Sequence, residues 1–139
     1  MKNLILVLPM LFLMNTASAK KNKKTKYTYP KEAIVQSIID HKLLQPFLHP
    51  ESKGRVPLVI SDHLIGKDFK LKKFNQPVKI VSEAEAKGAF LRFTSFDCKN
   101  GNYCNIAFEY LAEGVVGFTG AAIKRDGSHK LEKTDISKK

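Results

Sequence analysis

The sequence lacks tryptophan, holds only two cysteines among 139 residues, and has no apolar run long enough to form a membrane-spanning helix. The apolar run from Leu4 to Met14 falls short of the roughly 20 residues that a helical span requires. A structural zinc site would need two more ligands at matching spacing. Without tryptophan, the phenylalanines and tyrosines must fill an apolar core. A polytopic membrane protein and a zinc-stabilised module are therefore not indicated.

Sequence motifs of several enzyme classes are also absent. The chain has no Gly-rich phosphate loop, no Gly-x-Ser-x-Gly elbow and no His-Glu-x-x-His pair, and we predict no cofactor. The four histidines lie too far apart for a local metal motif, so we predict no metal site. They are His41, His49, His63 and His129.

Two patterns with carboxylates remain as catalytic candidates. Asp62 and His63 are adjacent, and a carboxylate can orient an imidazole, but neighbours on a strand point to opposite faces. Glu109 and Glu113 lie roughly 13 Å apart on an extended segment, farther than glycosidase carboxylates usually lie. We therefore predict a solvated loop at Asp62 and His63 and a turn at Glu113. Asp62 and His63 remain candidate catalytic residues only for the alternative that the protein is a small hydrolase-like enzyme.

The first 19 residues have the pattern of a cleavable export signal, with Lys2, an apolar run and then Ala17-Ser18-Ala19. Cleavage would leave 120 residues, which is enough chain for one modest core. We predict a signal peptide over residues 1–19, export through the Sec pathway to the periplasm or the exterior, and no transmembrane segment after cleavage.

The formal net charge of +11 is concentrated at the ends of the chain. The mature N-terminus carries Lys20, Lys21, Lys23, Lys24 and Lys26, and two more lysines end the chain. Without these seven and the lysine of the signal, 16 basic residues remain against 13 acidic ones, a net charge of +3. A nearly balanced body does not favour specific nucleic-acid binding. We interpret residues 20–28 as a flexible basic arm.

Two readings of this arm stay open. Lysine-rich ends of a chain are commonly solvated tails. The same five lysines can instead contact an anionic surface, such as lipid head groups or an acidic polymer.

Export also bears on Cys98 and Cys104, which flank an Asn-Gly turn signal between strand-like segments. Cysteines that face each other across a hairpin can satisfy disulfide geometry, and an oxidising compartment preserves the bond. A redox site would usually have two intervening residues and a helix N-terminus. We therefore predict a structural disulfide between Cys98 and Cys104.

Hydrophobic periodicity predicts one α+β domain over residues 29–137. From Lys31 to Gln45, apolar residues recur at three- and four-residue spacing, which is typical of a helix with one buried face. They are Ile34, Val35, Ile38, Ile39 and Leu43. Short strand-like or extended segments follow at 56–61, 69–74 and 78–81, and Pro57 favours an edge position for the first. The last two alternate apolar and basic residues, so we expect them to be exposed.

The C-terminal half predicts four strands, at 90–96, 103–112, 115–124 and 129–136, joined by short glycine-containing connections. Successive strands should therefore pair antiparallel. The N-terminal helix should pack on a curved antiparallel sheet that ends in this four-stranded meander. Three glycines in one strand region, Gly114, Gly117 and Gly120, predict a bulge or strong bend.

The aromatic residues of these strands allow two interpretations. They can fill the core of a small domain, or they can line a cleft between sheet and helix that holds an apolar ligand. We favour the core. The residues are Phe90, Phe93, Phe96, Phe108, Tyr110 and Phe118.

The order of elements resembles the cystatin-like and nuclear-transport-factor-2-like rolls in outline. Residues 77–88, 90–93, 108–110 and 113–117 also resemble a pattern in small exported bacterial proteins of unknown function. Leu131 departs from that pattern, because such proteins often have tryptophan in the last strand. The resemblance implies an exported α+β fold and names no reaction.

We expect an exported, non-catalytic binding domain whose partner is a protein or an anionic component of the cell envelope. A small hydrolase-like enzyme and a carrier of an apolar ligand are the alternatives. The sequence does not specify the oligomeric state.

Overall fold

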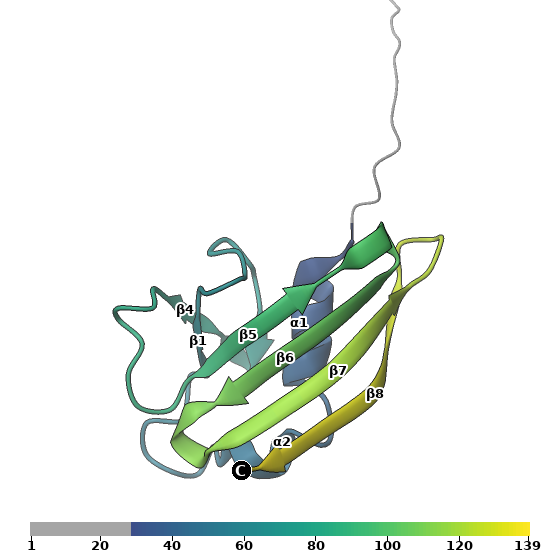
Figure 1. Ribbon diagram of the computed structural model, residues 1–139. Helices are drawn as coiled ribbons and strands as arrows, with labels where there is room; N and C mark the ends of the chain where they lie inside the picture. The colour runs from purple at the N-terminus through teal and green to yellow at the C-terminus, as the bar shows by residue number, and fades with distance from the viewer. Residues whose placement is uncertain (1–28) are drawn as a thin grey trace, which may run out of the picture.

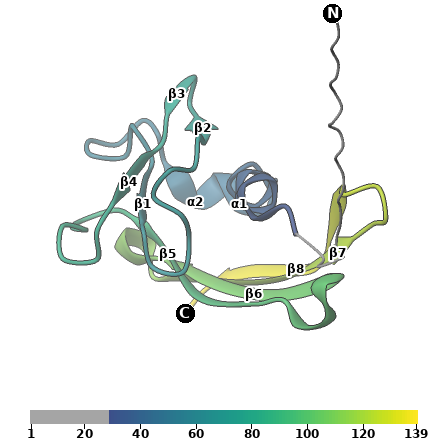
Figure 2. The same ribbon diagram turned by 90° about the horizontal axis from the view of Figure 1, so that it is seen from above.

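Six strands form one sheet, and two short helices lie on one side of it (Figures 1 and 2). The computed structural model describes residues 29–139, so the predicted signal peptide and basic arm lie outside the described residues. The helices are α1 (Lys31–Ile39) and α2 (Gln45–Leu48). The strands are β1 (Val59–Ser61), β2 (Lys72–Lys73), β3 (Gln76–Pro77), β4 (Lys79–Val81), β5 (Leu91–Asp97), β6 (Tyr103–Tyr110), β7 (Val115–Ile123) and β8 (His129–Lys138). The predicted α+β class is confirmed.

The sheet is mixed, with the strand order β4-β1-β5-β6-β7-β8. Strands β5 to β8 pair antiparallel in chain order, whereas β1 pairs parallel with both β4 and β5. The prediction of an antiparallel sheet is therefore wrong for β1 and β4. A parallel neighbour requires a crossover, and here residues 62–78 run between β1 and β4. Strand β1 lies between β4 and β5, so the edge position that Pro57 suggested is wrong. Because Pro57 precedes the first residue of β1, its missing N–H group does not interrupt the hydrogen bonds of the strand.

Helix α1 is shorter than its apolar pattern predicts. It ends at Ile39, after which the N–H group of Asp40 donates to the carbonyl oxygen of Gln36 and that of His41 donates to the carbonyl oxygen of Ile38. Four of the five predicted stripe residues are buried, but Leu43 lies beyond the helix and is 41 % exposed. Pro46 does not end α1; it lies in the first turn of α2, where a missing N–H group leaves no hydrogen bond unmade.

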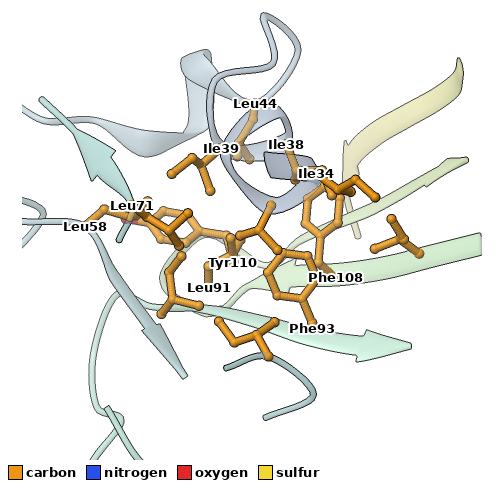
Figure 3. Close-up of a cluster of buried hydrophobic side chains, with 14 of the residues drawn as sticks. Ile34, Ile38, Ile39, Leu44, Leu58, Leu71, Leu91, Phe93, Phe108 and Tyr110 are labelled. Carbon is orange, nitrogen blue, oxygen red and sulfur yellow. The ribbon is translucent and has the colours of Figure 1, made fainter. Parts of the chain in front are cut away.

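The core lies between α1 and the helix-facing side of the sheet (Figure 3). Phe93, Phe108 and Tyr110 have almost no exposed surface, and the rings of Phe93 and Phe108 lie 5.8 Å apart between centroids. Leu58 and Leu71, which lie in connecting segments, belong to the same cluster. These aromatic residues therefore fill the core, as the sequence favoured.

Two glycines of β7 admit aromatic rings from β6. A Cβ atom at Gly117 would overlap the ring of Phe108, and one at Gly120 would overlap the hydroxyl group of Tyr103. The predicted bulge is also present, because the register between β7 and β8 shifts between Phe118 and Gly120. The one extra residue is on β8, where Lys133 has a positive φ of 55°.

Candidate functional site

The segment Lys67–Lys79, which includes β2 and β3, is the most basic stretch of the described chain and is named here the lysine surface. It holds five lysines and one acidic residue, Asp68. Phe74 and Asn75 form its turn with φ values of 59° and 61°, the backbone signs of a type I′ hairpin turn. Figure 2 shows this hairpin on the same side of the sheet as the helices.

Side chains of α1 fix the backbone of the lysine surface. The Gln36 amide donates to the carbonyl oxygen of Lys72 at 2.8 Å and accepts from its N–H group at 3.0 Å. The Glu32 carboxylate accepts from the N–H group of Lys70 at 2.6 Å. Because Gln36 satisfies both backbone groups of Lys72, it acts as a neighbouring strand would. The helix therefore positions the backbone from which these lysines extend.

The lysines of this surface differ in their partners. Lys67 lies 3.4 Å from Asp62, and Lys73 lies 3.3 Å from Asp40. Lys70, Lys72 and Lys79 are exposed, and none of their ammonium groups has a carboxylate within 4 Å among residues 29–139. Three ammonium groups are thus available to an external anion.

A small groove opens beside these lysines. Its volume is about 210 Å³, and Phe69, Pro77 and Val78 supply most of its apolar lining, next to the nearly buried Leu71. Lys70 and Lys72 complete it. The sequence indicated an apolar-basic segment here, but the groove depends on the hydrogen bonds to α1 and was not predicted.

The structure places Asp62 and His63 just after β1, where Asp62 pairs with Lys67. His63 donates its backbone N–H group to the Ser61 hydroxyl, at 3.1 Å. No hydrogen bond joins the Asp62 and His63 side chains in the described part of the chain. The sequence-based pair is therefore not assembled as a carboxylate–imidazole dyad.

A different polar cluster, which the sequence did not predict, lies at the end of β1. The Ser61 hydroxyl donates to Glu83, and the Arg92 guanidinium holds both carboxylate oxygens of Glu83 at 3.1 Å. These two partners, the hydroxyl first, hold the pKa of Glu83 below its usual value, which weakens it as a general base. Ser61 is fully buried. The cluster links β1, β5 and the turn after β4, and no local sequence motif predicts it.

Glu109 and Glu113 also occupy separate environments. Glu109 lies 3.8 Å from Arg92 and 3.8 Å from Lys139. Glu113 ends the single-turn helix Leu111–Glu113, so its prediction as a turn residue is confirmed. The two carboxylates are thus neutralised by different cations and do not form one acid–base site.

Three basic groups converge on Glu113. Arg55 donates to one carboxylate oxygen at 2.7 Å, while Lys138 and His49 lie 3.5 Å and 3.9 Å from the other. The hydrogen bond from Arg55 is the main reason that the pKa of Glu113 lies below its usual value. Glu113 thereby joins the loop of Arg55 to the C-terminal end of β8.

Acid is expected to remove this contribution to stability. A carboxylate whose pKa is lowered in the folded state stabilises the fold fully above its unfolded-state pKa of about 4.3, and this contribution disappears as pH falls through the folded-state pKa. Glu113→Gln should therefore be less stable than the unmodified chain near pH 7, and the difference should shrink below about pH 4. Urea unfolding across pH measures this.

Glu132→Gln is the control for Glu113→Gln, because Glu132 has no basic group within 4 Å among the described residues. Its effect near pH 7 should be smaller. A Glu113→Gln effect that stays constant down to pH 2 would contradict the role of the ionised carboxylate.

The opposite face of the sheet carries a second hollow, of about 340 Å³. Tyr103, Phe118 and Gly120 contribute to its lining, together with polar groups of Ser95 and Asn105. Phe118 is 57 % exposed and is therefore not part of the core. The sequence allowed an apolar-ligand cleft between the sheet and the helix. This hollow is on the other face of the sheet and is not that cleft.

Cys98 and Cys104 form the predicted disulfide. No group of three or more metal-ligating side chains occurs within residues 29–139. None of the helices in this part of the chain is long and apolar enough to cross a membrane. The five lysines predicted to contact an anionic surface, Lys20 to Lys26, lie outside the described residues.

Comparisons with protein-family models, curated proteins and solved structures gave no significant match.

Proposed function

We propose that this chain is an exported, non-catalytic binding domain that engages an anionic component of the cell envelope through the lysine surface. The observation that carries the proposal is a set of three exposed lysines whose ammonium groups have no carboxylate within 4 Å among residues 29–139. Lys70 and Lys72 extend from a backbone that is bonded to α1, and Lys79 lies in β4. Export rests on the signal pattern of residues 1–19. The proposal takes the domain to be a helix across a curved sheet that ends in a four-stranded meander.

The charges are large enough to support binding. A lysine near a negatively charged membrane surface contributes about 1 kcal/mol. Three such lysines therefore supply an affinity gain on the order of 100-fold over a neutral surface. The basic arm, with Lys20, Lys21, Lys23, Lys24 and Lys26, adds attraction of the same sign.

Vesicle sedimentation tests the proposed function. The mature chain should sediment with phosphatidylglycerol-containing vesicles and stay in solution with pure phosphatidylcholine vesicles. Binding should fall strongly as salt rises to about 1 M, where electrostatic attraction is screened beyond about 3 Å. Equal sedimentation with both kinds of vesicle, or no sedimentation with either, would overturn the proposal.

A further inference from the structure

The lysine surface contains apolar area that an electrostatic contact does not explain. Two short segments line the groove of about 210 Å³, residues 69–72 and residues 77–78. Lys70 and Lys72 flank Leu71, and alternate residues of an extended segment point to the same side. Since Leu71 is only 2 % exposed, its side chain belongs to the core, whereas Lys70 and Lys72 are exposed at the groove.

The groove is held in shape by neighbouring contacts. Leu71 packs in the core, and its carbonyl oxygen accepts from the N–H group of Val78 at 2.9 Å. The backbone groups of Lys70 and Lys72 are bonded to Glu32 and Gln36. A ligand therefore meets a largely formed site and does not have to order the segment as it binds.

We propose that the groove binds the apolar chain of an anionic amphiphile, whose charged head group pairs with Lys70 and Lys72. This inference rests on the proposed function and names the class of anion. An acidic polymer would use the ammonium groups and leave the apolar lining exposed. An uncharged apolar ligand would leave the two lysines without a counter-ion.

The size of the groove limits the ligand further. Pockets for drug-sized molecules usually measure about 300–1,000 Å³, so about 210 Å³ fits one short alkyl segment. The aliphatic stems of the lysines extend the apolar lining while their ammonium groups stay in water. The groove therefore selects a single chain next to one anionic group.

A series of alkyl phosphates below their micelle concentrations tests this inference by calorimetry. Inorganic phosphate should bind weakly, and butyl, hexyl and octyl phosphate should bind progressively tighter, by roughly fourfold for each buried methylene until the groove is full. Lys70→Gln combined with Lys72→Gln should weaken the binding of every alkyl phosphate in the series.

Val78→Thr isolates the apolar contribution, because threonine keeps the shape of valine and adds a hydroxyl group to the lining. It should weaken octyl phosphate binding several-fold and leave inorganic phosphate unchanged. Val56→Thr is the matched control outside the groove and should bind octyl phosphate as the unmodified chain does. Circular dichroism of both variants checks that each is folded.

The outcomes separate the two proposals. If inorganic and octyl phosphate bind equally while anionic vesicles still bind, the amphiphile groove is wrong and the proposed function stands. If chain length matters but Val78→Thr has no effect, the groove is not the binding place. If octyl phosphate binds as expected and anionic vesicles do not, the proposed function fails and the groove remains.

Discussion

Replacing Phe108 with alanine is expected to lower the free energy of unfolding by about 3–5 kcal/mol. Phe108 is only 2 % exposed, packs against Phe93 and covers the position where Gly117 has no side chain. Its removal loses apolar burial and leaves a cavity that the surrounding strands cannot fill. Because a domain of this size is stable by about 5–15 kcal/mol, the change removes a large part of the total. Urea unfolding at neutral pH measures it.

Phe118→Ala is the matched control, since it makes the same change on the neighbouring strand β7 and on the opposite face. With Phe118 57 % exposed, the free energy of unfolding should change by no more than about 0.5 kcal/mol. Equal losses in the two variants would contradict the assignment of these residues to opposite faces of the sheet.

These two phenylalanines show how far the sequence could predict the core. Alternation along β6 places Ile106, Phe108 and Tyr110 on one face, and all three are buried. Phe118 was predicted to lie in the core with the other aromatic residues of these strands. Its exposure follows from the alternation along β7, where Gly117 and Thr119 face the core. Alternation therefore predicted the buried face of β6, but the role of each aromatic residue needed the paired strands.

The N-terminal half was harder to predict, because its structure depends on distant partners. Strand β1 has only three residues and pairs parallel with β4, whose partner residues lie 20 positions further along the chain, as in Ile60 and Ile80. A strand this short gives little periodic signal. The cluster of Ser61, Glu83 and Arg92 follows from this pairing and not from any local spacing.

The lysine surface illustrates the same limit at the candidate site. The alternation of apolar and basic residues predicted exposed extended segments at 69–74 and 78–81. It did not predict that Gln36 bonds the backbone of Lys72, because that contact spans 36 residues. The charge of the segment was visible in the sequence, whereas the groove depends on its attachment to α1.

Combining Lys70→Gln, Lys72→Gln and Lys79→Gln is expected to weaken binding to phosphatidylglycerol-containing vesicles on the order of 100-fold, at about 1 kcal/mol for each lysine. These three side chains are exposed and lack acidic partners within 4 Å in the described residues, so their loss breaks no ion pair of the fold. The free energy of unfolding should therefore stay nearly unchanged. Vesicle titration followed by sedimentation measures the affinity, and urea unfolding measures the stability.

The control variant carries Lys42→Gln, Lys53→Gln and Lys130→Gln. These lysines are also exposed and without acidic partners in the described residues, but they lie outside the lysine surface. Both triple variants lower the net charge by the same amount, so long-range attraction to the vesicle falls equally in each. If only the total charge mattered, the two variants would bind alike, and the lysine surface would lose its role. A large loss confined to the first variant would place the contact on Lys70, Lys72 and Lys79, because only groups near the anionic surface escape screening by salt.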